Sequence, residues 1–205
     1  MELKGTPKAG DLLSWALPVL LHRLANQTQW ITGLRSVLSL GGGDEWLQSK
    51  GPDLTQAGQN LQDAGWLLAV LGSGQGANLL LARREPRGLA LMVGLLEEGL
   101  RKETGQALPR PERLPSLSAH ALDGWQLPYA LGHLVWQSYG VDRAQDGWTL
   151  EGPSEAGWVL DLPWSGAPDA CAWLAEVLPG CPWNQTQPGR LQVTLPSAWL
   201  EAQPK

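Results

Sequence analysis

The longest regular pattern of apolar positions lies near the start of the chain, between Leu17 and Leu40. Its apolar residues recur at intervals of three, four and seven, which predicts an amphipathic helix with one packed seam. The seam consists of Leu17, Leu20, Leu24, Ile31, Leu34 and Leu38. Asp11 is a suitable N-cap for a first turn, and Pro18 predicts either the start of the main helix or a kink within it. The glycines at 41–43 predict its end.

A second apolar stripe of matching length follows, from about Asp53, which Pro52 precedes, to about Leu71. Two helices joined by a short glycine-rich loop are expected to form an antiparallel hairpin. A hairpin with long apolar faces cannot bury both faces by itself. We therefore predict that it pairs with the same hairpin of a second copy, which gives a four-helix bundle in a homodimer. The alternative is that the hairpin packs only on the rest of its own chain.

The remaining chain predicts a second structural unit after the glycine-rich segment 72–76, which we interpret as a linker. The expected elements, in order, are a helix over 86–102, a strand over 117–121, a helix over 127–139, a hairpin of strands over 148–151 and 157–162, a helix over 169–178 and a strand over 190–195. This order predicts an α+β sandwich with helices on one face of a mixed sheet. The expected domains are a helical hairpin over 11–72 and the sandwich over 77–200.

Composition and charge narrow the classes of partner. The 205 residues carry a net charge of −5 and no block of Lys and Arg, which argues against a nucleic-acid binder. No apolar run approaches the roughly 18 residues of a membrane span, and the N-terminus lacks the apolar core of a secretory signal. We therefore expect a cytoplasmic protein that binds neither nucleic acid nor membrane. Cys171 and Cys181 form no metal-binding spacing, and we expect them to be reduced and structural, although they are close enough in sequence to form a disulfide if oxidised.

Candidate chemistry begins with His22, which falls off the seam of the first helix. Asn26 follows one turn later, so both side chains leave the same helical face. The segment HRLAN from His22 to Asn26, together with the following Gln29, Ile31 and Gly33, resembles the H-box of two-component histidine kinases and histidine phosphotransferases. In those proteins the phosphoacceptor histidine stands in an H-x-x-x-N/T context on the first helix of a dimerising hairpin. The alternative is an ordinary surface histidine.

The second part of the chain resembles the ATP-binding domain of the same kinases, through the segment LPSLSAHALDGWQLPYALGHLVWQSYG at 114–140. On the kinase N-box pattern, His133 and Gln137 occupy the two Asn positions, and Asp161 falls where the family places its adenine-binding Asp. The chain departs from the pattern in three ways. Gln137 replaces an Asn that holds Mg²⁺, the glycines that follow the adenine-binding Asp are missing, and 165–168 is too short for an ATP lid. The resemblance therefore implies an ATPase half that has decayed into a structural domain.

A chain that keeps the histidine and the hairpin without the ATP site is similar to the dimeric histidine phosphotransferases. This resemblance implies that His22 accepts a phosphoryl group from an aspartyl phosphate on a response regulator receiver domain and passes it to a second receiver. The receiver supplies Mg²⁺, so no cofactor of the chain's own is expected. Asn26 would orient the imidazole or a water, and Arg23 would stabilise phosphohistidine charge or meet the acidic receiver surface.

Two other functions remain open on the same residues. The first is a non-catalytic, pseudokinase-like dimeric adaptor, which binds a receiver domain or a kinase without accepting phosphate. Arg23 favours this reading, because kinases that phosphorylate themselves normally carry an acidic residue directly after the histidine. The second is a residual ATP-binding kinase with unusual sequence boxes. Phosphate on His22 distinguishes the phosphotransferase from the adaptor, and nucleotide binding identifies the kinase.

Overall fold

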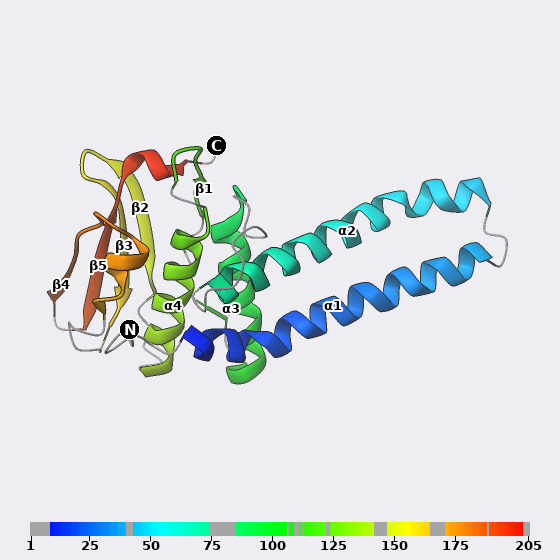
Figure 1. Cartoon of the computed structure of the whole chain (residues 1–205), viewed down its shortest axis with the longest axis horizontal. Coiled ribbons are helices and arrows are strands. Elements are labelled where there is room, and N and C mark those ends of the chain that lie inside the picture. The colour runs from blue at the N-terminus through cyan, green and yellow to red at the C-terminus, as the bar shows by residue number, and fades with distance from the viewer. Residues whose placement is uncertain are drawn as a thin grey trace.

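Figure 1 shows the computed structural model of the chain, in which a long helical hairpin extends from a layered α+β part. The structure describes residues 9–39, 43–73, 85–105, 107–108, 111, 113–121, 124–141, 147–164, 171–187 and 189–202. The helices are α1 (Ala9–Ser39), α2 (Asp44–Ser73), α3 (Gly88–Thr104), α4 (Gln126–Val141), α5 (Leu174–Val177) and the 3₁₀ helix η3 (Ser197–Trp199). The strands are β1 (Ser116–Leu117), β2 (Thr149–Ser154), β3 (Gly157–Pro163), β4 (Trp183–Gln187), β5 (Arg190–Leu195) and β6 (Leu200–Glu201).

The two long helices form the expected hairpin, but both are longer than the sequence pattern predicts. α1 begins nine residues before Pro18, so this proline lies inside the helix and does not start it. The prediction that the second helix begins at Asp53 is wrong, because α2 begins at Asp44 and runs through Pro52. Two acidic residues in its first turn, Asp44 and Glu45, suit the positive end of a helix dipole. Each proline costs its helix one hydrogen bond without ending it.

The main sheet is antiparallel throughout, with strand order β2-β3-β5-β4, so the prediction of a mixed sheet is wrong. β5 follows β4 in sequence and lies between β4 and β3, antiparallel to both. The predicted hairpin of β2 and β3 is confirmed, with Leu150 opposite Leu160. Sequence patterning missed β4, whose residues 184–186 are polar and exposed. A separate two-stranded ribbon pairs β1 with β6.

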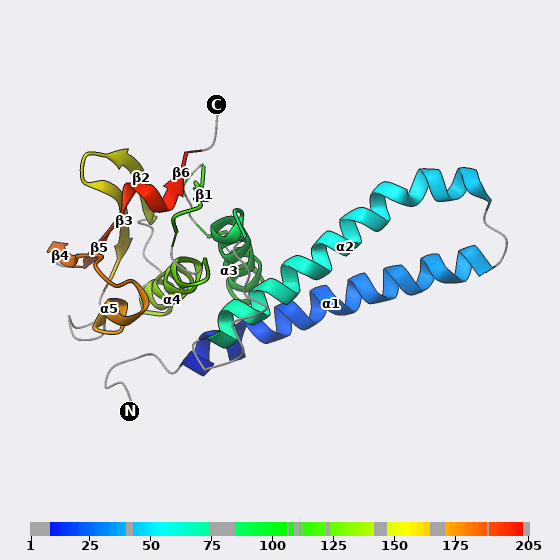
Figure 2. The ribbon, with the colours of Figure 1, turned by 45° about the horizontal axis from the view of Figure 1, so that its top comes forward.

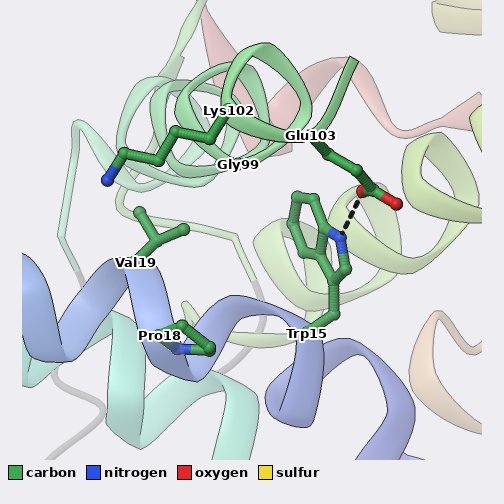
Figure 3. A pocket seen from close by; sticks show the side chains of 6 residues that line it. All are labelled: Trp15, Pro18, Val19, Gly99, Lys102 and Glu103. Atoms are coloured by element: carbon green, nitrogen blue, oxygen red, sulfur yellow. Dashed lines mark hydrogen bonds between the residues drawn. The ribbon is translucent and has the colours of Figure 1, made fainter.

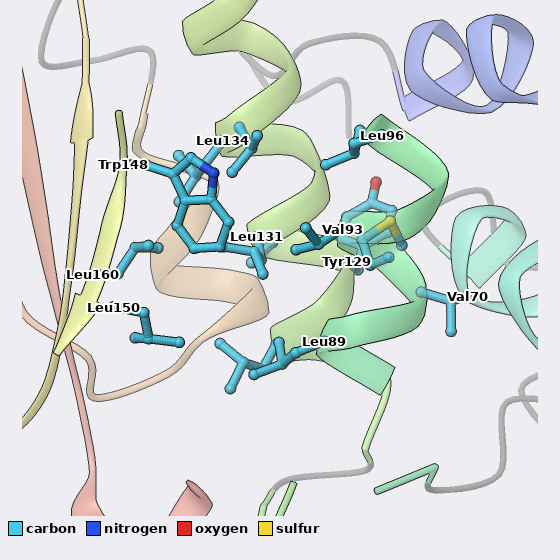
Figure 4. Close-up of a cluster of buried hydrophobic side chains, with 14 of the residues drawn as sticks. Val70, Leu89, Val93, Leu96, Tyr129, Leu131, Leu134, Trp148, Leu150 and Leu160 are labelled. Carbon is cyan, nitrogen blue, oxygen red and sulfur yellow. The ribbon is translucent and has the colours of Figure 1, made fainter. Parts of the chain in front are cut away.

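The molecule is layered in the order sheet, α4, α3 and hairpin (Figure 2). One continuous cluster of buried apolar side chains connects these layers, from the hairpin base through α3 and α4 to the sheet. In Figure 4, Trp148 and Leu160 of the sheet side face Leu131 and Leu134 of α4. The α+β class is confirmed, and the four-helix bundle and the ATPase-type sandwich stay predictions.

The hairpin divides into a packed base and a projecting outer half. In the base, Leu20 and Leu67 are fully buried and belong to the same core as α3. In the outer half, Leu34 and Ala57 are the only buried hydrophobic residues among those described between residues 25 and 58. The proposed domain division stays a prediction, since segment 74–84, which includes most of the predicted linker, lies outside the described residues. The base of the hairpin is nevertheless packed as part of the larger core.

Candidate functional site

The structure brings the predicted His22 and Asn26 together on the exposed surface of α1. Asn26 Nδ2 lies 3.1 Å from His22 Nε2, across one helical turn. With the amide as donor, Nε2 is the unprotonated nitrogen of a neutral imidazole and the proton resides on Nδ1. The lone pair of a neutral imidazole is the nucleophile that phosphoryl transfer requires. Asn26 therefore lies within hydrogen-bond distance of the nitrogen that would attack, while the histidine is exposed to solvent.

Arg23, the third predicted site residue, points to α3. Its Nε donates to Glu98 Oε2 at 2.7 Å, and its Nη2 donates to the carbonyl oxygen of Gly94 at 3.3 Å. Lys102 Nζ donates to the other oxygen of Glu98 at 2.8 Å. Burial acts to raise the pKa of Glu98, but the hydrogen bonds from Lys102 and Arg23 outweigh it, so this pKa lies below its ordinary value. The role of Arg23 at a phosphohistidine stays a prediction, and in this structure its guanidinium joins α1 to α3.

The surroundings of His22 follow from the geometry of α1, in which successive side chains are about 100° apart. Arg23 is turned about 100° to one side and faces α3. Leu21 is turned about 100° to the other side and is 54% exposed, and Leu17, in the same direction, is 37% exposed. Leu20 points to the opposite side of the helix and is fully buried. His22 thus lies in an open sector between α3 on one side and an exposed apolar strip on the other.

Of the two residues at the N-box positions, His133 is buried among aromatic rings and Gln137 is half-buried. His133 on α4 is 2% exposed, and its ring centroid lies 4.5 Å from that of Tyr129 and 5.7 Å from that of Trp173. Neither ring nitrogen of His133 has a hydrogen-bond partner among the described residues, and the same is true of Gln137 Oε1. Burial lowers the pKa of His133 to about 4, so the imidazole is neutral at pH 7. Aromatic packing therefore surrounds His133 on α4.

Asp161 is held on the opposite face of the sheet from α4. It lies on β3 between the buried positions Leu160 and Leu162, so its side chain points outward. Its two carboxylate oxygens accept hydrogen bonds from Arg190 Nε at 2.5 Å and from Gln192 Nε2 at 2.9 Å. The structure therefore does not bring Asp161 and His133 together, and Asp161 joins neighbouring strands.

Other candidate chemistry is sparse in the part of the chain that the structure describes. No group of three or more His, Cys, Asp or Glu side chains there is arranged to hold a metal ion. Cys171 and Cys181 are free, buried thiols, and burial raises their pKa values to about 12 and about 11. Among the described helices, none combines the length and apolar character that crossing a membrane requires. Comparisons with protein-family models, with curated proteins and with solved structures found no match to this chain.

The sequence does not predict the residues of α3 that contact Arg23 and Trp15. A groove of about 310 Å³ separates α1 from α3, and its lining includes Trp15, Pro18 and Gly99 (Figure 3). The indole Nε1 of Trp15 donates to Glu103 Oε2 at 2.9 Å. One signal of this contact was present in the sequence. Arg23 is a charged residue in the sector of α1 that packs inward, and such a residue requires a partner from another element.

Proposed function

We propose that the protein is a histidine phosphotransfer protein of two-component signalling, with His22 as the phosphoacceptor. The observation that carries the proposal is the exposed imidazole of His22, whose Nε2 is held by Asn26 on the first helix of a long hairpin. The partners are response regulator receiver domains, one of which donates a phosphoryl group while another receives it. We propose no ATP-dependent activity, because His133 is packed among aromatic rings in the core and Asp161 is on the opposite face of the sheet from α4.

The reaction needs few groups of this chain other than the imidazole of His22. The lone pair of His22 Nε2 attacks the phosphorus of an aspartyl phosphate in line, so an N–P bond forms while the P–O bond to the aspartate breaks. The aspartate leaves as a carboxylate, Nδ1 keeps its proton, and the receiver provides Mg²⁺. Asn26 releases Nε2 as the phosphorus arrives. The reverse sequence, with the aspartate of a second receiver as nucleophile, carries the phosphoryl group onward.

The apolar residues of the hairpin support the proposed homodimer. On α1, apolar residues recur every seven positions on the sector next to Leu21: Leu17, Leu24, Ile31 and Leu38. On α2, half-buried leucines recur with the same interval: Leu54, Leu61 and Leu68. A 100° rotation per residue turns Leu24 only about 100° from Arg23, which faces α3, and Leu24 packs against the core, so the α1 strip lies along the edge of the hairpin seam. Seven-residue spacing on two adjacent helices is typical of a four-helix bundle seam.

The same α2 surface offers room for a second copy. Glycines at 51, 58 and 65 also repeat every seven residues, and a Cβ built on each of these three meets no atom within 4 Å. They lie beside the half-buried leucines, so apolar side chains of a partner hairpin can approach the α2 backbone closely. Packing two copies on these strips leaves the His22 sector uncovered, because Leu24 and Ile31 lie on the opposite side of α1 from His22.

The test is transfer of label from a panel of phosphorylated receiver domains to the purified protein. We expect acid-labile label on the wild type and none on His22→Gln. His120→Gln is the matched control, because His120 is also exposed but has no place in the proposal. Full transfer to His22→Gln would overturn the proposed function. Receiver binding without label would instead favour the adaptor.

A further inference from the structure

The turn of α1 that precedes His22 contains a weak point. Pro18, one turn before His22, lacks an amide hydrogen, so the carbonyl of Ser14 receives no helical hydrogen bond. Two side chains of α1 that bracket this proline are both attached to α3. Trp15 precedes it and bonds to Glu103, and Arg23 follows it and bonds to Glu98. Helix α3 therefore contacts α1 on both sides of the weakened turn.

The attachment before the proline depends on a glycine of α3. In Figure 3 the Trp15 indole stands beside Gly99, with its ring nitrogen turned to Glu103. A Cβ built on Gly99 would overlap the outer edge of the Trp15 ring, so only glycine allows this approach. Trp15 also packs near Trp136 of α4, with ring centroids 6.5 Å apart. The indole is thus held on one edge by packing and on the other by a charged hydrogen bond.

The attachment after the proline is a charged network. Arg23 and Glu98 have side chains that are 30% and 23% exposed, and their charged atoms are 2.7 Å apart. Lys102 adds a second bond to Glu98, which keeps this carboxylate in place. A partly buried ion pair with additional hydrogen bonds is held more firmly than a fully exposed pair, which contributes little.

We infer that Trp15, Glu98 and Gly99 are positioning residues of the phosphotransfer site, because they attach α3 to α1 on both sides of Pro18. We call this pair of attachments the splint. The inference rests on the proposed function of His22. With the splint, α1 presents the imidazole in one orientation to a partner that docks as a rigid body. Without it, the turn at Pro18 bends, and the in-line geometry with a bound aspartyl phosphate is lost. Misplacement of reacting groups by about 1 Å can cost about a hundredfold in rate.

Three variants separate this positioning role from general stability. Gly99→Ala displaces Trp15 and removes its bond to Glu103. Gly94→Ala is the matched control on the same helix, because a Cβ there meets no atom within 4 Å and the backbone carbonyl that accepts from Arg23 is kept. Pro18→Ala restores the missing helical hydrogen bond, so in the double variant with Gly99→Ala the splint is no longer needed. A variant that is merely unstable would gain nothing specific at His22 from the loss of the proline.

Two readouts are measured on each variant: hydrogen exchange of the backbone amides of residues 19–24, and the rate of His22 labelling. Labelling uses a phosphorylated receiver domain in one arm and phosphoramidate, a small donor, in the other. For Gly99→Ala we expect exchange about tenfold faster, the scale of losing a hydrogen bond to a charged group. We expect receiver-dependent labelling to slow about tenfold and phosphoramidate labelling to stay unchanged, since a small donor adapts to any orientation. Gly94→Ala should match the wild type, and the double variant should regain both rates.

Each alternative result has a definite meaning. Unchanged exchange and unchanged receiver labelling in Gly99→Ala would overturn the splint. Equal slowing of both labelling reactions, or no recovery in the double variant, would show a purely structural effect and overturn the positioning role. If neither donor labels the wild type, the proposed function fails, and the positioning role fails with it. The exchange arm then still decides whether α3 supports the Pro18 turn.

Discussion

Replacing His133 by phenylalanine is expected to remove much of the protein's sensitivity to mild acid. The imidazole is 2% exposed, stacks near Tyr129, and has no hydrogen-bond partner among the described residues. Burial lowers its pKa from 6.5 to about 4. Between these two values the unfolded chain binds a proton that the folded chain does not, so falling pH favours unfolding. The contribution of His133 to stability is complete above pH 6.5, falls as the pH is lowered, and levels off below about 4.

The size of this effect follows from the two pKa values. Below pH 4, the difference between the pKa values of 6.5 and about 4 lowers the free energy of unfolding by about 3 kcal/mol, at about 1.4 kcal/mol per pKa unit. At pH 5 the loss is about 2 kcal/mol. Losses of this size are large beside the roughly 5–15 kcal/mol that stabilise a typical domain. Phenylalanine keeps the ring contacts with Tyr129 and Trp173 and gives up no hydrogen bond, so His133→Phe should be about as stable as the wild type at pH 7.

The assay is urea unfolding of the wild type and His133→Phe at pH 7 and at pH 5. Between pH 7 and pH 5, the free energy of unfolding of the wild type should fall by about 2 kcal/mol more than that of the variant. Glu98 and other carboxylates also respond to acid, but equally in both proteins, so the difference isolates His133. His120→Gln, at an exposed histidine, should behave as the wild type does. Equal losses in the wild type and His133→Phe, or an NMR titration of His133 with a midpoint near 6.5, would refute the reasoning.

Three further outcomes follow from the structure. Asn26→Ala should speed receiver-dependent labelling of His22 about three- to tenfold, because the hydrogen bond that it removes occupies the lone pair of Nε2 and has to break before attack. Leu61→Glu should convert the proposed dimer to a monomer in sedimentation velocity runs, while Gln62→Glu, at an exposed neighbour, should leave it unchanged. Asp161→Ala should lower the free energy of unfolding by about 1.5–3 kcal/mol in a denaturant titration, because two strand-joining hydrogen bonds to a charged group are lost.

Hydrophobic spacing was sufficient to predict most of the helices and the β2–β3 hairpin. It failed at Pro52, where a local signal for a helix start was overridden, and at β4, where the residues show no apolar alternation. Pro52 predicts a helix start, yet α2 continues through it, because the cost of one lost hydrogen bond is smaller than the gain from a long packed helix. β4 has exposed polar residues at 184–186 and shows no apolar alternation, so its pairing with β5 is evident only in the folded sheet.

The candidate site was predictable only as far as its interactions are local. His22 and Asn26 are four residues apart, and helix geometry alone places them together. Arg23 bonds to Glu98, which is 75 residues away in sequence, so only tertiary packing reveals where its guanidinium lies. The same holds for Asp161, whose contacts with β5 depend on strand register.

These observations together describe an asymmetric environment for His22. One side of its sector is closed by α3, which is attached through Arg23. The other side leads to the exposed strip with Leu17 and Leu21, which the proposed dimer covers. Under the proposed function, a receiver domain would reach the imidazole through the sector between them. The hairpin base, α3 and the sheet share one core.

The most direct test of the central claim is to locate the phosphoryl group after the protein has been mixed with a phosphorylated receiver domain. Mass spectrometry under alkaline conditions, which preserve phosphohistidine, distinguishes the three histidines of the chain. The account predicts one added phosphoryl group, carried by His22, with none on exposed His120 or on buried His133. A phosphoryl group on His120, or an unmodified chain with every receiver that binds it, would contradict the account.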